Sequence, residues 1–236
     1  MSYLGFSKLL VRDFLTNFNN PKVLEIGLDV GQTTLPMIHN MSVHFDEFTY
    51  VGIDVSVNNL LIQQIGQLSG IHIKDFDKNK GKKNVEIYEA NSLEWLYANI
   101  NQEKIYESYD LIMIDGDHNY YTVFNELAML ENLTHNHTLI VCDDYQGRYR
   151  DKDLFYVERD THRKNIHLRE PVRLERQGVG EAIDDYISKS IGRLSSFTFG
   201  PLEPCFICNS KFMEMKTIKL GSSMRESMVK FTFKDF

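Results

Sequence analysis

The sequence predicts an α/β fold in which a seven-stranded, mostly parallel sheet ends in an antiparallel closing strand and carries helices on both faces. Short apolar runs bounded by turn residues alternate with amphipathic stretches of roughly 10 to 15 residues, as in βαβ units. The chain of 236 residues is 42% hydrophobic and 25% charged, which excludes collagen-like, low-complexity and disordered classes. That length suits one domain whose core needs no disulfide bonds.

A leading helix and five strand–helix units occupy the first 145 residues. Leucine and phenylalanine side chains at helical spacing predict the leading helix over 3–18. Apolar runs followed by polar residues predict five strands, at 22–27, 48–55, 85–90, 109–115 and 138–144. Helices are predicted after Gly31, with a break near Pro36, and over 57–69, 92–100 and 120–133. Residues 74–84 lack apolar periodicity and predict a solvated loop.

The alternation of strands and helices stops after Asp144. Residues 146–177 contain few apolar residues and no sustained period, and helical spacing resumes over 178–194. Two further strands, at 196–200 and 204–209, are predicted to close the sheet, and a hairpin is predicted at 212–220 and 228–236. We therefore expect one domain over 1–236, with an N-terminal helix in 1–20, an inserted lid-like segment at 146–177 and a C-terminal extension at 210–236.

The charge of the chain is divided unevenly between its segments. The formal net charge is −7, and residues 1–145 carry 9 Lys and Arg against 20 Asp and Glu. Residues 146–177 carry 9 against 6, and they include seven of the ten arginines. The acidic total argues against a general nucleic-acid partner. The arginine-dense segment needs an explanation of its own.

The cysteines and the apolar pattern predict where the protein works. Three cysteines cannot form a disulfide framework, so we expect a reducing, cytoplasmic environment. No run approaches about 18 apolar residues, so we expect neither a membrane span nor a membrane partner. Cys205-x-x-Cys208 lacks a second ligand pair for zinc and fits a buried strand. The Phe and Met residues of the tail predict internal packing or a homo-oligomer interface.

Polar residues follow every predicted strand of the first half. Ligands of open α/β sheets bind beyond the carboxyl ends of the strands, where the strand order switches, so these residues predict the site. Gly27 and Gly31 permit a tight turn and a close approach of the backbone to a ligand. Asp54 can accept hydrogen bonds from both hydroxyls of a ribose, and Asn91 can address an adenine edge. Taken alone, an aspartate after a strand, such as Asp54, is more often a turn former or helix cap.

Five segments together resemble the class I S-adenosylmethionine-dependent methyltransferases. They are VLEIGLDVGQTT (23–34), YVGIDVS (50–56), YEANSLEWL (88–96), YDLIMIDGDHNYY (109–121) and LIVCDDY (139–145). The pairing of IDGDH with the later DDY resembles the metal-dependent small-molecule O-methyltransferases of the macrolide-sugar and cephalosporin-pathway type. The resemblance covers about residues 20–145 and the GVGEAIDDY helix. It implies a Rossmann-like fold, S-adenosylmethionine as the cofactor and a small-molecule acceptor.

The resemblance also implies which residues bind the cofactor. The implied residues are Glu25, Gly27, Gly31, Asp54, Asn91, Ser92 and Asp115. The glycine loop would lie beside the methionine part of the cofactor, Asp54 at the ribose, and Asn91 and Ser92 beside the adenine. The family often has an acidic residue where Asn91 stands. It also often has a Pro-Gly-Gly turn where 134–137 reads Thr-His-Asn-His, a turn we expect to lie far from the site.

Some members of the resembling group bind a divalent metal after the fourth and fifth strands, where this chain has Asp115, Asp143 and Asp144. Three hard carboxylate ligands suit Mg²⁺, which would orient a substrate hydroxyl and lower its pKa. His118 would then take the proton of that hydroxyl. Without a cation the three carboxylates would repel one another, unless they are exposed to solvent. His118 is alternatively a solvent-facing turn residue.

The inserted segment predicts a lid over the strand ends. Connections longer than about 15 residues are usually functional or disordered, and this one follows the fifth strand. We expect substrate contacts from Tyr145, Arg148, Arg150 and Arg163. The alternative is a solvated loop of mixed charge.

Three other functions compete with small-molecule methylation. A nicotinamide dehydrogenase would need Gly-x-Gly-x-x-Gly after the first strand, which this turn lacks. A nucleic-acid or protein methyltransferase could use the arginine-rich segment. A catalytically decayed cofactor-binding domain is opposed by the presence of Asp115, His118, Asp143 and Asp144.

Overall fold

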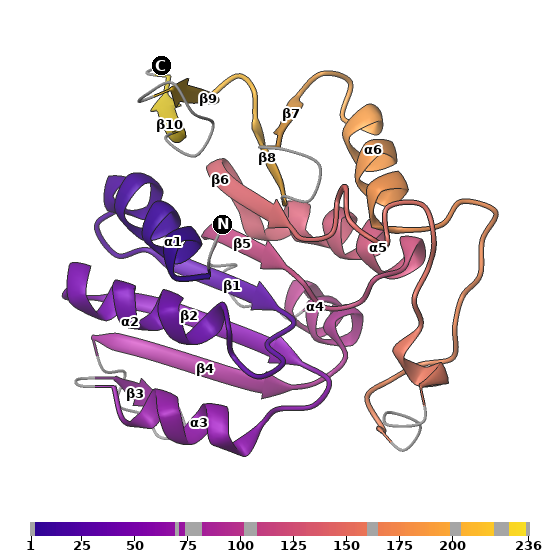
Figure 1. Cartoon of the computed structure of the whole chain (residues 1–236), viewed down its shortest axis with the longest axis horizontal. Helices are drawn as coiled ribbons and strands as arrows, with labels where there is room; N and C mark the ends of the chain where they lie inside the picture. Colours follow the sequence, from indigo (N-terminus) through magenta and orange to yellow (C-terminus); the bar gives the residue numbers. More distant parts are fainter. Residues whose placement is uncertain are drawn as a thin grey trace.

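The computed structural model describes residues 3–68, 71–73, 82–101, 108–159, 165–198, 204–219 and 227–234. An eight-stranded sheet forms the centre of the molecule, in the order β3-β4-β2-β1-β5-β6-β8-β7 (Figure 1). Its strands are β1 Lys22–Ile26, β2 Phe48–Asp54, β3 His72–Ile73, β4 Lys83–Glu89, β5 Tyr109–Ile114, β6 Thr134–Cys142, β7 Leu194–Phe197 and β8 Cys205–Asn209. No helix of the described ranges is long and apolar enough to cross a membrane.

The sheet confirms the predicted arrangement of strands. The pairings from β3 through β6 are all parallel, and β8 pairs antiparallel with both β6 and β7. The two-residue strand β3 adds an edge strand to the seven that were predicted. Because β1 lies between β2 and β5, the strand order switches there, and the carboxyl ends of β1 and β5 mark the expected binding crevice.

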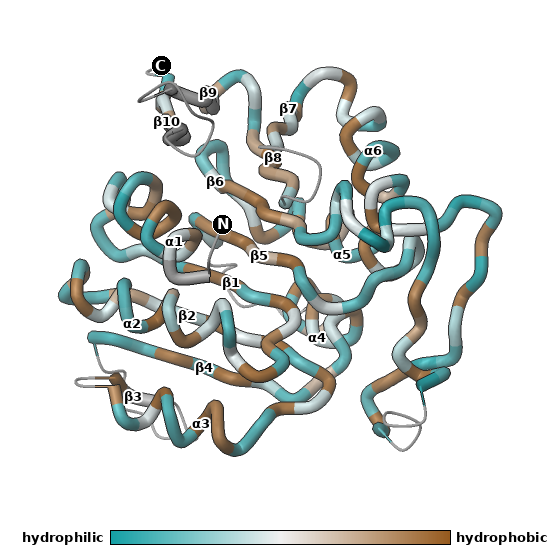
Figure 2. The backbone as a smooth tube through the Cα atoms, in the orientation of Figure 1, coloured by the Kyte–Doolittle hydropathy of each residue, from teal (hydrophilic) through white to brown (hydrophobic). Residues whose placement is uncertain are grey.

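Helices cover both faces of the sheet (Figure 1). One face carries α1 Tyr3–Lys8, the π-helix η1 Leu9–Phe14, η2 Leu15–Asn17, α2 Thr34–His44 and α3 Asn59–Gly66. The other face carries α4 Ser92–Asn101, α5 Tyr120–Leu130, η3 Glu131–Leu133 and α6 Val179–Lys189. Successive residues of β1, Val23 and Leu24, are fully buried in the two opposite hydrophobic clusters. The strands must therefore be apolar on both faces where they cross the core, and Figure 2 shows the later parts of β5 and β6 as hydrophobic.

Side-chain caps explain where several helices begin. The Asn58 side chain accepts from the backbone N–H of Leu60 at the start of α3, and Asn119 accepts from Thr122 at the start of α5. Pro36 does not break α2, contrary to the prediction. It lies in the first turn, where the missing N–H of proline removes no helical hydrogen bond.

Two other expectations are corrected at the edges of the fold. Residues 134–137 are not a separate turn, because they form the start of β6, where Thr134 pairs with Tyr109. The segment predicted as a loop over 74–84 contains the start of β4 at Lys83, and its residues 74–81 lie outside the described ranges. The tail forms the predicted hairpin, β9 Met213–Lys219 with β10 Ser227–Phe233, and Phe231 packs 5.1 Å from the ring of Phe14.

Candidate active site

A cavity of about 520 Å³ lies at the carboxyl ends of β1, β2, β4 and β5. Of the seven predicted cofactor residues, Gly27, Asp54, Asn91, Ser92 and Asp115 line it, whereas Glu25 and Gly31 do not. Its other lining residues are Ile26, Asp29, Ile53, Val55, Ser56, Asn58, Ala90, Gly116, Asp117, Thr122, Tyr156, Arg159 and Leu168. The structure thus gathers residues that are far apart in the sequence at the predicted crevice.

Gly27 is required by both the conformation and the packing of the turn after β1. Its φ is 90°, and a Cβ atom there would lie 2.2 Å from the backbone oxygen of Asp115. Any side chain at this position would push the turn after β1 away from the turn after β5. Gly31 also has a positive φ, and a Cβ atom there would lie 2.4 Å from the side chain of Leu61. Gly31 therefore lets the loop pack closely against α3 on the side away from the cavity.

Asp54 holds the glycine turn in place. Its Oδ2 accepts hydrogen bonds from the backbone N–H groups of Leu28 at 2.7 Å and Asp29 at 3.0 Å, and its Oδ1 accepts from Ser56 at 2.8 Å. A carboxylate has about four acceptor sites, so these three bonds leave about one for a ligand in the cavity. The turn-forming and ligand-binding interpretations of Asp54 are therefore compatible.

Glu25 is buried behind the glycine turn. Its Oε2 accepts hydrogen bonds from the hydroxyls of Thr34, at 2.7 Å, and Tyr50. Burial raises the pKa of Glu25 to about 8, and the hydrogen bonds from Tyr50 and Thr34 oppose this rise only in part. In this arrangement the residue supports the loop from the core instead of facing the cavity.

Asn91 and Ser92 lie at the start of α4, where the chain leaves β4. Asn91 caps the helix, because its Oδ1 accepts from the backbone N–H of Glu94 at 3.2 Å. The Ser92 hydroxyl donates to Glu126 at 2.5 Å, and Glu126 is fully buried on α5. Burial raises the pKa of Glu126 to about 8, and its other carboxyl oxygen has no hydrogen-bond partner among the described residues.

The acids after β5 and β6 meet around one histidine. The Nε2 atom of His118 lies 3.1 Å from an oxygen of Asp144 and 3.7 Å from an oxygen of Asp115. Burial lowers the pKa of His118, but the hydrogen bonds and charges of these two carboxylates outweigh burial and raise it to about 10. The imidazole is therefore buried and positively charged at neutral pH in this arrangement, and not solvent-facing.

The same acids repel one another. Burial and the negative charge of Asp115 raise the pKa of Asp143 to about 6. Asp144 has a φ of 53°, an uncommon conformation for a residue other than glycine. These carboxylates are the ligand type that a hard divalent cation prefers. As placed, however, no group of three or more His, Cys, Asp and Glu side chains among the described residues is arranged to hold a metal ion.

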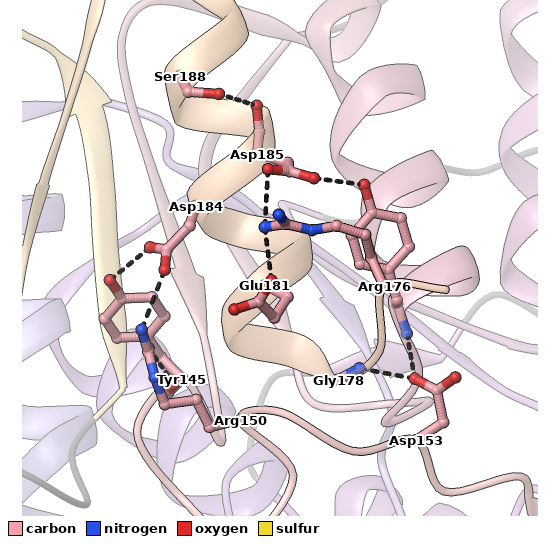
Figure 3. Close-up of polar contacts among 10 residues, drawn as sticks. Tyr145, Arg150, Asp153, Arg176, Gly178, Glu181, Asp184, Asp185 and Ser188 are labelled. Carbon is pink, nitrogen blue, oxygen red and sulfur yellow. Dashed lines mark hydrogen bonds and ion pairs between the residues drawn. The ribbon is translucent and has the colours of Figure 1, made fainter. Parts of the chain in front are cut away.

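The lid segment, residues 146–177, is fastened to α6 by two neighbouring aspartates (Figure 3). Arg150 lies 3.0 Å from Asp184, which also accepts a hydrogen bond from the Tyr145 hydroxyl. Arg176 lies 3.0 Å from Asp185. Tyr145 and Arg150, two of the predicted substrate residues, thus contact α6, while the Arg148 guanidinium lies 5.4 Å from the Tyr149 ring centre. The fourth, Arg163, lies outside the described residues.

The middle of the lid crosses to the far side of the cavity. Asn165 donates to the backbone oxygen of Val55 at 2.7 Å, and Arg169 pairs with Glu94 of α4 at 2.5 Å. The paired lid arginines are Arg150, Arg169, Arg173 and Arg176, all bound to carboxylates of this chain. This internal pairing gives no support to a phosphate-binding surface on the segment.

Besides Leu168, two lid residues that sequence reasoning did not single out line the cavity. They are Tyr156, in the short helix η4 Tyr156–Glu158, and Arg159, whose guanidinium lies 5.0 Å from the centre of the Tyr156 ring. Their segment was predicted as a lid, but nothing local distinguishes them from the other tyrosines and arginines of that segment. Asp117, in the IDGDH segment, was likewise given no role from the sequence, and it is a half-buried part of the cavity wall.

Comparisons with known proteins agree with this geometry. A family model described as a methyltransferase domain matches residues 24–145, just over half of the chain, and no curated protein shows a significant match. The apo structure of CalS11, a TDP-rhamnose 3'-O-methyltransferase of calicheamicin biosynthesis, is 14% identical with a TM-score of 0.54, covering 87% of this chain and 78% of that one. This likeness shows a shared fold.

Two further solved structures are more distant. Human methyltransferase-like protein 13, in complex with S-adenosylhomocysteine, is 14% identical with a TM-score of 0.46, covering 87% of this chain and 78% of that one. MycE of mycinamycin biosynthesis, in complex with Mg, S-adenosylhomocysteine and mycinamycin VI, is 14% identical with a TM-score of 0.49. That match covers 85% of this chain and 48% of MycE.

Proposed function

The chain belongs to the methyltransferase-domain family and is an S-adenosylmethionine-dependent enzyme, and from this premise we propose that it methylates a hydroxyl oxygen of a small hydroxylated acceptor. One observation carries the proposal. The cavity is lined by Gly27 and Asp54 on one side and by Asp115 on the other, and Asp115 adjoins the charged cluster around His118. A cofactor on the first side would present its methyl group toward polar groups on the second.

Each residue of the first side would contact a different part of the cofactor. Gly27 lets the backbone of the turn approach the ligand, and the remaining acceptor site of Asp54 takes one ribose hydroxyl. Because the oxygen of the Asn91 side chain already caps α4, its amide N–H groups are the part left to meet the adenine. Methyl transfer needs in-line approach of oxygen to the sulfonium methyl, so fixing the cofactor supplies much of the rate.

The residues of the second side orient the acceptor and take its proton. Asp115, Asp143 and Asp144 have the donor chemistry for Mg²⁺, which would supply charge compensation and acidify a hydroxyl bound to it. His118 serves as the base in the form in which the charges of Asp115 and Asp144 are compensated. The charges of Asp115 and Asp144 hold the pKa of His118 at about 10, and a cation held by these carboxylates would lower it toward the range in which the imidazole accepts a proton.

The test begins with cofactor binding and ends with transfer. Calorimetric titration with S-adenosylhomocysteine should show micromolar or tighter binding, with none to NAD. Asp54→Ala should weaken it by about 100-fold, or about 2.7 kcal/mol, which is within the range for the loss of one hydrogen bond to a charged group. Glu47→Ala, which removes an exposed partner of Lys82, is the matched control and should bind normally.

The acceptor class is tested with methyl-labelled S-adenosylmethionine. The panel contains a nucleotide-linked deoxysugar, suggested by the CalS11 likeness, together with a catechol, an RNA oligonucleotide and a histone peptide. We expect label on a hydroxyl of a small acceptor, increased by Mg²⁺ and abolished by chelation. Label on the RNA or the peptide alone would contradict the proposed acceptor class, and equal transfer with and without chelator would remove the metal from the proposal.

A further inference from the structure

The lid contacts His118 on the side away from the acids. The Tyr156 hydroxyl lies 3.2 Å from Nδ1 of His118, at hydrogen-bonding distance. The backbone N–H of Leu154 donates to the backbone oxygen of His118 at 2.9 Å, and the ring of Tyr149 lies 4.9 Å from the imidazole. Both ring nitrogens of His118 therefore have a partner, Nε2 among the carboxylates and Nδ1 on the lid.

Tyr156 is also part of the cofactor cavity. It lines the wall together with Arg159. Burial raises the pKa of Tyr156 to about 12, so its hydroxyl keeps its proton at neutral pH. Asp115 also lines the cavity, but it lies at Nε2 of His118, whereas Tyr156 lies at Nδ1. A ligand in the cavity and the Nδ1 side of the histidine thus share Tyr156 as a neighbour.

The lid is attached to the rest of the fold on both sides of Tyr156. Its near end is fastened to α6 through Arg150 and Asp184, and its far part is bound to the turn after β2 through Asn165 and Val55. Tyr156 lies between these two attachments in the sequence. The hydroxyl of Tyr156 is therefore placed at Nδ1 by a segment that is bonded to the rest of the fold on both sides of the residue.

We propose that Tyr156 is a positioning residue, whose hydroxyl orients the His118 imidazole from the lid and thereby links cofactor occupancy to the orientation of the proposed base. The proposal rests on the proposed function for the role of His118, but the contact itself does not. The χ2 torsion of a histidine is broad and nearly two-fold. A hydrogen bond to Nδ1 selects one of its two orientations and keeps Nε2 directed at the acids and the acceptor.

The first test is spectroscopic and needs no acceptor. Side-chain ¹⁵N spectra of the histidines are recorded for the full chain with and without S-adenosylhomocysteine, at one pH. In Tyr156→Phe, the Nδ1 signal of His118, assigned with His118→Gln, should shift or broaden, and it should no longer respond to the ligand. Tyr149→Phe keeps the ring contact, and its spectra should match those of the unmodified protein. An unchanged signal in Tyr156→Phe would overturn the proposal.

The second test separates positioning from cofactor binding. In Tyr156→Phe we expect kcat to fall about 10-fold, while the KM for S-adenosylmethionine and the Kd for S-adenosylhomocysteine change less than 2-fold. A parallel loss of cofactor affinity would make Tyr156 a cofactor-binding residue and contradict the proposal. If the unmodified protein methylates no acceptor of the panel, the proposed function fails, while the spectra still decide the role of Tyr156.

Discussion

The carboxyl edge of the sheet has two halves. The polar groups of one half are satisfied by hydrogen bonds within the fold, whereas the acids of the other half repel one another. In the glycine-turn half, at the ends of β1, β2 and β4, Asp54 accepts three backbone hydrogen bonds and Asn91 caps a helix. In the acidic half, at the ends of β5 and β6, burial and the negative charge of Asp115 raise the pKa of Asp143, and a charged histidine lies between Asp115 and Asp144.

The difference indicates two kinds of site. Groups satisfied within the fold form a rigid receptor, which binds a ligand with little rearrangement. Like charges held close together cost stability, and they persist where a bound cation or substrate compensates them. We therefore expect mutations in the first half to lose both binding and stability, and mutations in the second to lose activity while gaining stability.

The largest effect should come from Gly27→Ala in the glycine-turn half. The new Cβ would meet the backbone oxygen of Asp115, so we expect a loss of about 3 kcal/mol or more in unfolding free energy and no detectable S-adenosylhomocysteine binding. Gly192→Ala is the matched control, since Gly192 also has positive φ but its Cβ would meet no atom within 4 Å. It should cost only about 1 kcal/mol. Urea unfolding of both variants checks the comparison, and equal losses would show that backbone strain alone matters.

Asp143→Asn tests the acidic half and should separate stability from activity. It removes a carboxylate whose pKa is about 6, so at pH 7.5 without added metal the unfolding free energy should rise, by about 1 kcal/mol because solvent screens this exposed side chain. Methyl transfer should fall by about 100-fold, because a proposed acceptor-orienting ligand is lost. Calorimetry and initial rates measure the two effects. A destabilised Asp143→Asn protein would mean that the acidic half is not under electrostatic strain.

The pH dependence of stability should report Glu25. In the fold its pKa is about 8, above its ordinary value of 4.5. Between these values the folded chain keeps a proton that the unfolded chain releases. Its contribution is therefore complete below about pH 4.5 and is lost as pH rises through 8, at up to about 1.4 kcal/mol per unit.

Glu25→Gln should reduce the loss of unfolding free energy with rising pH. Part of that loss should remain, because the pKa of Glu126 is also raised to about 8. Urea unfolding at pH 5.5, 6.5 and 7.5 gives the slopes. The exposed Glu47→Gln serves as the control, and its slope should match that of the unmodified protein. Parallel curves for Glu25→Gln and the unmodified protein would show that Glu25 is ionised inside the fold.

The smallest effect should come from Asn91→Asp. The new carboxylate still caps α4, but it replaces the amide donors that we assign to the adenine. We expect S-adenosylhomocysteine to bind about 5-fold more weakly, equivalent to about 1 kcal/mol, with unchanged thermal stability. Tighter binding would instead indicate that an acid at this position accepts from the adenine amino group, as the resemblance to the family implies.

The sequence by itself determined the order of the strands and helices and the edge at which the site lies. Apolar runs and helical spacing are local signals, and parallel strands bring their carboxyl ends to one edge whatever the details of packing. Gly27, Asp54 and Asp115 were therefore predicted together, and all three line the cavity. The local pattern could not show that Glu25 faces the core, since that depends on Tyr50 from the neighbouring strand.

Only the tertiary structure decided what the arginine-rich segment does. Counting charges showed an excess of positive charge over 146–177, but not that Arg169 pairs with Glu94, 75 residues earlier, or Arg150 with Asp184. It likewise decided that Tyr156 meets His118, 38 residues away. Side-chain pairs so distant in sequence leave no local periodicity. Which acid meets which arginine is fixed by how the lid crosses the sheet, and that path is set by packing.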